Sequence, residues 1–182
     1  AIRRGGHVMK LLIGVVLGVV LLLLAVGAVL ATGSFDTGAI EPPSRLEQRV
    51  ARWALDRSVA RRAPEKANPL AGSAPAAREG LGIYREQCLF CHGAPGVDPS
   101  KAGQGLNPGA PDLSVPRVQR RTDGQLFYLT GSGIRMTGMP AFSATHSEEE
   151  LWKLVAALRR LPELTAEETA LLKGSPAPAP VN

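Results

Sequence analysis

Residues 87–93 read Gln-Cys-Leu-Phe-Cys-His-Gly and contain both cysteines of the 182-residue chain. Cys88 and Cys91 are three positions apart, and His92 follows at once. On one turn of helix, two thiols at this spacing can form thioether bonds to the two vinyl groups of a single haem. The imidazole of His92 would then point at the iron from the proximal side. The spacing predicts one covalently bound haem c, attached through Cys88 and Cys91, with His92 as the proximal axial ligand.

Two other kinds of site use a Cys-x-x-Cys pair. A thioredoxin-like redox site needs a βαβ context, whereas the sequence on both sides of this pair is helical in pattern. A structural metal site needs two further ligands, which the sequence does not supply. A disulfide framework needs cysteines spread along the chain, so that class of protein is excluded. Haem attachment is the interpretation that the pair favours.

The second axial ligand of the haem needs a separate argument. A low-spin haem that carries electrons has a ligand opposite His92, and methionine gives a higher reduction potential than a second histidine. Three side chains are candidates, Met136, Met139 and His146. Met139 precedes Pro140 in a glycine-rich loop, which favours an extended chain that exposes the sulfur. We expect Met139 to be the distal ligand; Met136 would pack beside the haem, and His146 would lie near the surface.

Residues 76–173 resemble a class I monohaem cytochrome c. The features that carry the resemblance are Gly80 and Tyr84 before the motif, the loops Pro111-Asp112-Leu113 and Gly138-Met139-Pro140-Ala141-Phe142, and the helix that begins Leu151-Trp152-Lys153. In that family a small residue lets the last helix cross the first closely, and the methionine of the distal loop binds the iron. The resemblance implies an all-α cytochrome c fold of helices and long loops around one haem.

The N-terminal part of the chain is strongly apolar. Residues 11–31 carry no charge, and a helix of that length is about 31 Å long, close to the ~30 Å hydrocarbon core of a bilayer. Arg3, Arg4 and Lys10 precede it, so the positive-inside rule places residues 1–10 in the cytoplasm. The prediction is a single transmembrane helix in a bacterial inner membrane with the haem domain in the periplasm. A cleaved signal peptide is the alternative, although the run is longer than a usual signal core.

Residues 32–75 are predicted to form a periplasmic connector with a helix at about 44–62. Ser44 and Glu47 give the S-x-x-E pattern of a capping box. This helix has an apolar stripe formed by Leu46, Val50, Trp53 and Ala54. An adjacent basic stripe consists of Arg45, Arg49 and Arg52. Such a helix either lies on a membrane surface or a partner subunit, or it is a spacer that covers the main domain. Residues 64–75 are expected to be an extended linker.

The cytochrome domain is expected at 76–174, and a flexible proline-rich tail at 175–182. Within the domain we predict helices at 76–87 and 123–130, a long loop at 94–119, a helix after the capping pattern Ser147-x-x-Glu150, and a short last helix after Thr165-x-x-Glu168. The stripe that would bury the penultimate helix consists of Leu151, Leu154, Val155, Leu158 and Leu161.

The charge distribution narrows the range of partners. Residues 1–75 carry the whole net charge of +5, and residues 76–182 are neutral. A nucleic-acid-binding protein would spread basic residues over its folded domain, so no nucleic acid is expected. The expected partners are membrane lipid and redox proteins or the subunits of a complex, without a small-molecule substrate.

The sequence thus predicts a membrane-anchored periplasmic cytochrome that transfers single electrons between respiratory or photosynthetic partners. It would act as an electron-transfer subunit of a membrane complex rather than as an enzyme. The alternative is a haem enzyme or gas sensor with a displaceable distal ligand. For that function His146 or Arg135 would have to act as an acid–base group on the distal side.

Overall fold

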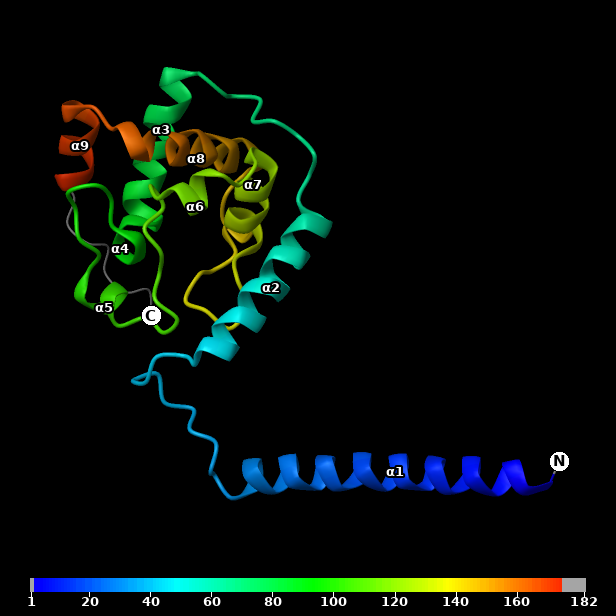
Figure 1. Ribbon diagram of the computed structural model, residues 1–182. Helices are drawn as coiled ribbons and strands as arrows, with labels where there is room; N and C mark the ends of the chain where they lie inside the picture. Colours follow the sequence, from blue (N-terminus) through cyan, green and yellow to red (C-terminus); the bar gives the residue numbers. More distant parts are fainter. Residues whose placement is uncertain (1, 175–182) are drawn as a thin grey trace. The chain divides into compact units, whose positions relative to one another are not determined.

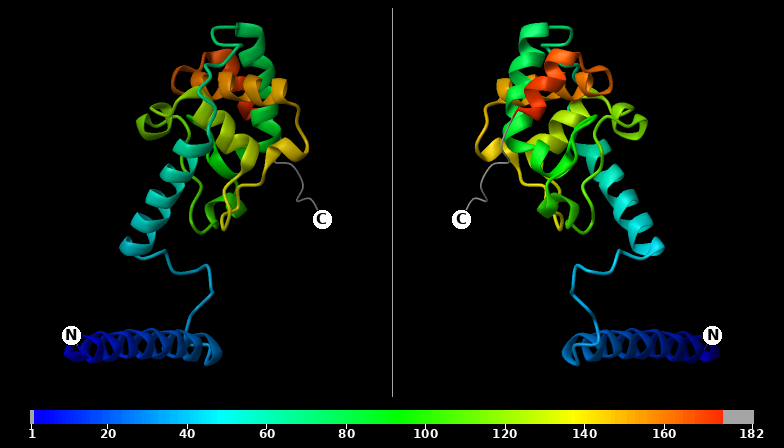
Figure 2. Two further views of the ribbon diagram at one scale, coloured as in Figure 1. Left: turned by 90° about the vertical axis from the view of Figure 1, so that its right-hand side faces the viewer. Right: turned by 90° about the vertical axis from the view of Figure 1, so that its left-hand side faces the viewer.

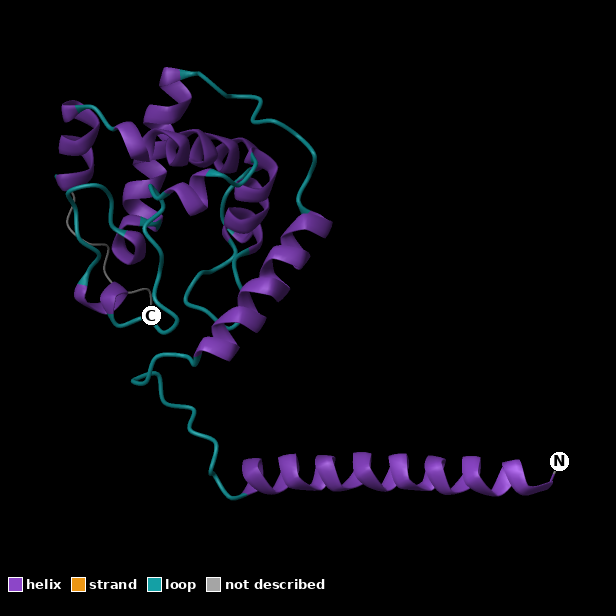
Figure 3. Cartoon of the chain, viewed as in Figure 1, coloured by secondary structure: helices purple, strands orange, loops and turns teal. Residues whose placement is uncertain are grey.

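The computed structural model describes residues 2–174, and its regular secondary structure is helical (Figure 3). No strand forms within that range, where an isolated bridge joins Ala94 and Val97. This confirms the all-α fold class. The chain divides into two units, residues 1–39 and 40–182. The predicted tail at 175–182 lies outside the described residues.

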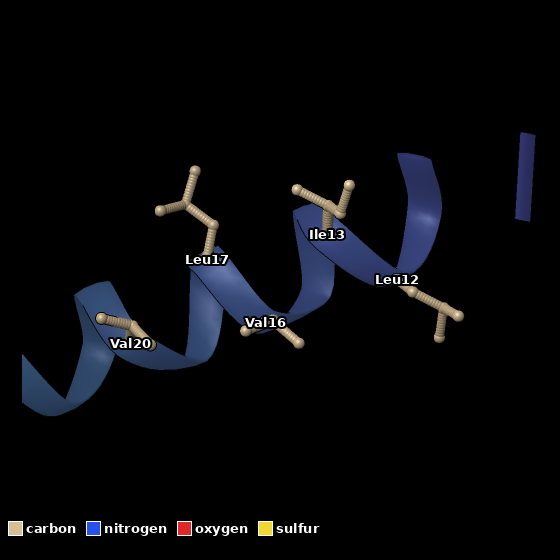
Figure 4. Close-up of a pocket in the computed structure, with 5 residues that line it drawn as sticks. All are labelled: Leu12, Ile13, Val16, Leu17 and Val20. Atoms are coloured by element: carbon tan, nitrogen blue, oxygen red, sulfur yellow. The ribbon is translucent and has the colours of Figure 1, made fainter. Parts of the chain in front are cut away.

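The first unit contains one long helix, α1 (Ile2–Ala31). Residues 7–31 are long and apolar enough to cross a membrane, and a signal sequence near an N-terminus would meet the same criterion. Figure 4 shows five apolar side chains that project from this helix, those of Leu12, Ile13, Val16, Leu17 and Val20. Within the first unit these side chains are exposed.

The second unit holds all the other helices (Figures 1 and 2). In chain order they are α2 (Arg45–Arg62), α3 (Ala74–Gln87), α4 (Leu89–His92), α5 (Lys101–Gln104), α6 (Pro116–Gln119), α7 (Asp123–Ser132), the 3₁₀ turn η1 (Phe142–Ala144), α8 (Glu148–Arg160), the 3₁₀ turn η2 (Leu161–Glu163) and α9 (Ala166–Lys173). The predicted loop at 94–119 therefore contains two short helices, α5 and α6.

The centre of this unit is the crossing of α3 and α8 (Figure 1). A side chain at Gly80 would overlap the backbone carbonyl of Lys153, so only glycine permits this close approach. The apolar stripe predicted for α8 faces the core, and each of its five members is at most 3% exposed. Its last member, Leu161, lies in η2. Trp152 is also buried and stacks on Phe127 of α7, with ring centroids 4.1 Å apart.

Side-chain caps determine where the helices of the domain begin. Complete capping boxes precede α7, α8 and α9, at Thr122 with Gln125, Ser147 with Glu150, and Thr165 with Glu168. Of the three capping patterns predicted from the sequence, those at Ser147 and Thr165 form complete boxes. The third, Ser44 with Glu47, forms only the bond to the Ser44 hydroxyl. At α2 the Ser44 hydroxyl accepts the Glu47 N–H at 3.2 Å. The first domain helix begins two residues earlier than predicted, because Ser73 caps it.

The segment between α2 and α3, predicted as an extended linker, is not helical, but it turns at residues 69–72 and is attached to the domain. Asn68 is only 5% exposed, and its side-chain amide donates to the carbonyl of Trp152 at 2.9 Å. The backbone N–H of Asn68 donates to Asp123 at 3.0 Å. Arg159 of α8 holds the same carboxylate from the other side at 2.7 Å. One buried asparagine therefore holds this segment against the starts of α7 and α8.

Helix α2 also packs on the domain, although the residues it uses are not those of the predicted stripe. Val59 is fully buried, and Asp56 forms a 2.7 Å ion pair with Arg121. Leu46, Val50 and Trp53 remain largely exposed. Periodicity identified an apolar stripe, but it could not tell which side of the helix the domain covers.

Candidate functional site

The Cys-x-x-Cys-His motif forms a single turn between α3 and the next loop. The N–H of Cys88 still donates to Tyr84 of α3 at 2.8 Å, and the N–H of His92 donates back to the carbonyl of Cys88 at 2.9 Å. Gly93 ends the turn with a φ of 60°, a conformation that favours glycine. The two thiols and the imidazole are therefore carried by one rigid turn, as thioether attachment with iron ligation requires.

Tyr84 fixes this turn to the core. Its side chain is fully buried, and its hydroxyl donates to the carbonyl of Gly93 at 2.6 Å. Burial raises the pKa of Tyr84 well above its usual value, so the hydroxyl stays a donor at any physiological pH. This hydrogen bond joins a residue before the motif to the residue directly after it, and it was not predicted from the sequence.

The two cysteines differ in exposure. Cys88 is 7% exposed, whereas Cys91 is half-buried. Burial, together with neighbouring Cys91, raises the pKa of Cys88 to about 12, and burial also raises the pKa of Cys91. Both thiols are therefore protonated at neutral pH before any haem is attached.

His92 has a defined orientation. Its Nδ1 atom lies 2.7 Å from the carbonyl oxygen of Pro111, so Nδ1 carries the proton and donates. The other ring nitrogen, Nε2, is then the unprotonated atom with a lone pair for a metal. Burial lowers the pKa of His92, with smaller opposing effects of the Pro111 bond and Asp112, and this favours the neutral ring that ligation requires.

Met139 lies in a loop closed by hydrogen bonds within itself. The N–H of Ile134 donates to the carbonyl of Met139 at 3.2 Å, and the Thr137 hydroxyl accepts the N–H of Met139 at 3.2 Å. Gly133 begins the loop with a φ of 63°, and a side chain there would collide with the backbone of Met139 and Pro140. Met139 itself is half-buried. Its backbone position is thus determined before any ligand is considered.

The other distal candidates have different surroundings. Met136 is 92% exposed and has a φ of 61°, which is unusual for a residue with a side chain. His146 packs edge-on against Phe142 and lies 2.9 Å from the hydroxyl of Thr145. It lines a shallow hollow with Tyr128 between α7 and the start of α8. Met136 thus lies in the same loop as Met139 but is exposed, and His146 is half-buried outside that loop.

One segment, residues 105–115, connects the two predicted ligand regions. The Pro111 carbonyl of this segment accepts the hydrogen bond from His92. Its Leu106 side chain packs so tightly on Gly138 that a methyl group added at Gly138 would overlap the Leu106 side chain. Two regions almost 50 residues apart in sequence are therefore held by the same connecting segment. The Pro111 loop carried part of the family resemblance, but its bond to His92 had no signal in the sequence.

The chain's donor set suits a haem c. It offers two unactivated thiols on one turn, an imidazole whose Nε2 is available, and a thioether in a separate loop. These groups are the attachment points and the mixed nitrogen–sulfur axial pair of a haem used in electron transfer.

Residues 75–156 match the family described as "Cytochrome C oxidase, cbb3-type, subunit III". The matched region includes the Cys-x-x-Cys-His turn and the Met139 loop. No curated protein matches the chain. A cytochrome c domain of this family implies a haem c and electron transfer in respiration. Residues 75–156 are therefore a cytochrome c domain of the cbb3-type oxidase subunit III family, and this domain follows an N-terminal apolar helix.

Proposed function

We propose that this protein is a membrane-anchored respiratory electron carrier that works as a subunit of a cbb3-type oxidase complex. Cys88 and Cys91 hold the haem through thioether bonds, and His92 and Met139 are its axial ligands. The observation that carries this proposal is the 2.7 Å contact between Nδ1 of His92 and the Pro111 carbonyl. This bond fixes the ring and leaves Nε2 for the iron.

The haem supplies a one-electron couple when it is bound. The chain's own residues determine the reduction potential of that couple. The Pro111 carbonyl increases the basicity of His92 by accepting a hydrogen bond from Nδ1–H, and the thioether of Met139 favours the reduced form. Hydrogen bonds of the Met139 backbone with Ile134 and Thr137 restrain the loop that carries the sulfur, which limits the rearrangement that accompanies a change of charge.

The apolar helix α1 gives this carrier its location. We infer that residues 7–31 cross the inner membrane and keep the domain on the periplasmic side. A tethered domain stays at high effective concentration near its redox partners. The domain therefore needs only a modest affinity for the other subunits to keep a fixed place in a complex.

Optical and magnetic spectra of the purified protein in both oxidation states test this function, with carbon monoxide added to the reduced form. We expect a low-spin, six-coordinate haem c that shows a methionine-sulfur charge-transfer band and does not bind carbon monoxide. A high-spin haem, or one that binds carbon monoxide, would replace the carrier function with that of an enzyme or gas sensor.

A further inference from the structure

The exposed side of α2 has no part in the electron transfer proposed above. Leu46, Val50 and Trp53 recur there at i, i+4 and i+7 and are 70%, 55% and 65% exposed. Leu55 and Val59 lie on the opposite side of the same helix, given 3.6 residues per turn, and Val59 is fully buried against the domain. Helix α2 thus has two apolar sides, of which the domain covers one.

The exposed stripe is bordered by positive charge. Arg45, Arg49 and Arg52 follow one edge of it, and Arg57 continues the stripe towards the end of the helix. Arg45 and Arg49 form no ion pair with any of the described residues of the second unit. This surface therefore combines uncovered apolar side chains with unneutralised guanidinium groups.

The carboxylates of α2 do not offset this charge. The helix carries six arginines, and its two acidic residues are Glu47 and Asp56. Asp56 is held in a 2.7 Å ion pair with Arg121 of the domain. The exposed stripe consequently lies on a cationic helix. A surface that carries negative charge above an apolar layer would complement it.

We propose that α2 lies on the anionic phospholipid surface of the membrane, with Leu46, Val50 and Trp53 immersed among the headgroups. Interfacial helices have this combination of a shallow apolar face and basic borders, and tryptophan is enriched at headgroup level. Arginines next to the surface add attraction to acidic lipids. Residues 32–44 separate α2 from the apolar helix and span at most about 45 Å, so α2 is within reach of the same membrane.

The proposal rests on the membrane anchor of the proposed function and goes beyond it. Because the Asp56–Arg121 ion pair and buried Val59 attach α2 to the domain, a helix held on the lipid surface would limit how the domain rotates. The tether would then determine the orientation of the domain relative to the membrane as well as its distance from the membrane.

A spin-label experiment on the full-length haem protein in vesicles tests the proposal. Single cysteines are introduced as V50C in the stripe, A51C on a neighbouring exposed position, and V16C in α1. Native cysteines bonded to haem take no label, which the unmodified protein verifies first; labelling of that protein would count against haem attachment, not against the surface helix. Relaxation by oxygen and by a water-soluble nickel complex reports the depth of each label.

We expect the label at position 50 to be accessible to oxygen and protected from nickel in vesicles that contain phosphatidylglycerol, while the label at 51 remains open to nickel. A label at 50 that is open to nickel would overturn the proposal. Protection from both reagents would also overturn it and would point to a protein partner. The label at 16 reads the anchor separately, so failure of the anchor and failure of the surface helix are distinguishable.

The charge contribution has its own test. Arg45 and Arg49 are replaced together by glutamine. The ratio of molecules whose label at position 50 is immersed in lipid to molecules whose label is exposed to water should then fall by roughly 25-fold, at about fivefold per arginine. R120Q, which changes an exposed arginine outside α2, is the matched control and should have no effect. Equal behaviour of the double variant and the control would contradict an electrostatic attraction to lipid.

Discussion

The Nδ1 atom of His92 donates a hydrogen bond to the carbonyl oxygen of Pro111 over 2.7 Å, across 19 positions of sequence. The same segment carries Leu106, which packs against Gly138 next to Met139. Relaxed packing of this segment would therefore affect both predicted axial positions together.

Met139→Ala is expected to leave the haem attached and to lower its reduction potential. Loss of the sulfur ligand should shift the potential on the order of 0.1 V, a fraction of the range of about 0.8 V that axial ligands span. Potentiometric titration and carbon monoxide binding measure the two effects. Met136→Ala is the matched control, because Met136 is 92% exposed; a change in that variant with none in Met139→Ala would reverse the ligand assignment.

Replacing Cys88 and Cys91 together by alanine should abolish covalent attachment of the haem. Without either thiol no thioether bond can form, so acid–acetone extraction should remove all haem from the protein. Haem that resists extraction in this double variant would contradict the attachment sites.

Gly80→Val should destabilise the domain by about 1–3 kcal/mol or more, the range found for overpacking. The added side chain would overlap the Lys153 carbonyl at the crossing of α3 and α8. Chemical denaturation of the haem-loaded protein measures the loss. Gly82→Ala, on the same helix with nothing within 4 Å of the new methyl group, should instead stabilise by about 0.5–1 kcal/mol. If both variants behaved alike, the crossing would not depend on Gly80.

Asn68→Ala should cost about 1–3 kcal/mol, because it removes a buried amide that bonds to Trp152 and Leu70. The segment from 63 to 73 should then exchange its amide hydrogens faster and become sensitive to proteases. Hydrogen exchange read by mass spectrometry checks this. Ala67→Ser, at an exposed neighbouring position, should leave exchange unchanged.

Asp123 should make the domain sensitive to acid. Burial alone would raise the pKa of its carboxyl, but the Asn68 amide and the Arg159 guanidinium outweigh that effect and hold the pKa below its usual value of 3.8. A carboxyl with a lowered folded pKa contributes stability that is present above its unfolded pKa and lost as pH falls through the folded value. Stability should therefore decline below about pH 4.

Denaturation at a series of pH values, with Asp123→Asn beside the unmodified protein, measures this contribution. The variant should be less stable at neutral pH and should show a smaller decline in acid. Asp98→Asn, which changes an exposed carboxylate, should keep the full decline. An unchanged pH profile in Asp123→Asn would show that the ion pair with Arg159 does not contribute.

Much of the fold was predictable because its signals are local. A cap such as Ser147 with Glu150 satisfies amides within four residues, and the apolar stripe of α8 repeats at helical spacing, so both can be seen in the sequence. Asn68 could not be identified in this way. Its partners, Asp123 and Trp152, are 55 and 84 positions away, and nothing in its immediate sequence distinguishes it from a solvated loop residue.

The sequence by itself determined the chemistry of this protein. The spacing of Cys88, Cys91 and His92 defines the haem attachment motif, and the apolar run before residue 32 defines a candidate membrane span, since both depend only on neighbours along the chain. The tertiary structure decided which side of α2 is covered, which ring nitrogen of His92 donates to Pro111, and that Met136 is exposed whereas Met139 is half-buried. Those features depend on packing between distant segments, where burial and hydrogen bonding select one arrangement from several that the local sequence allows.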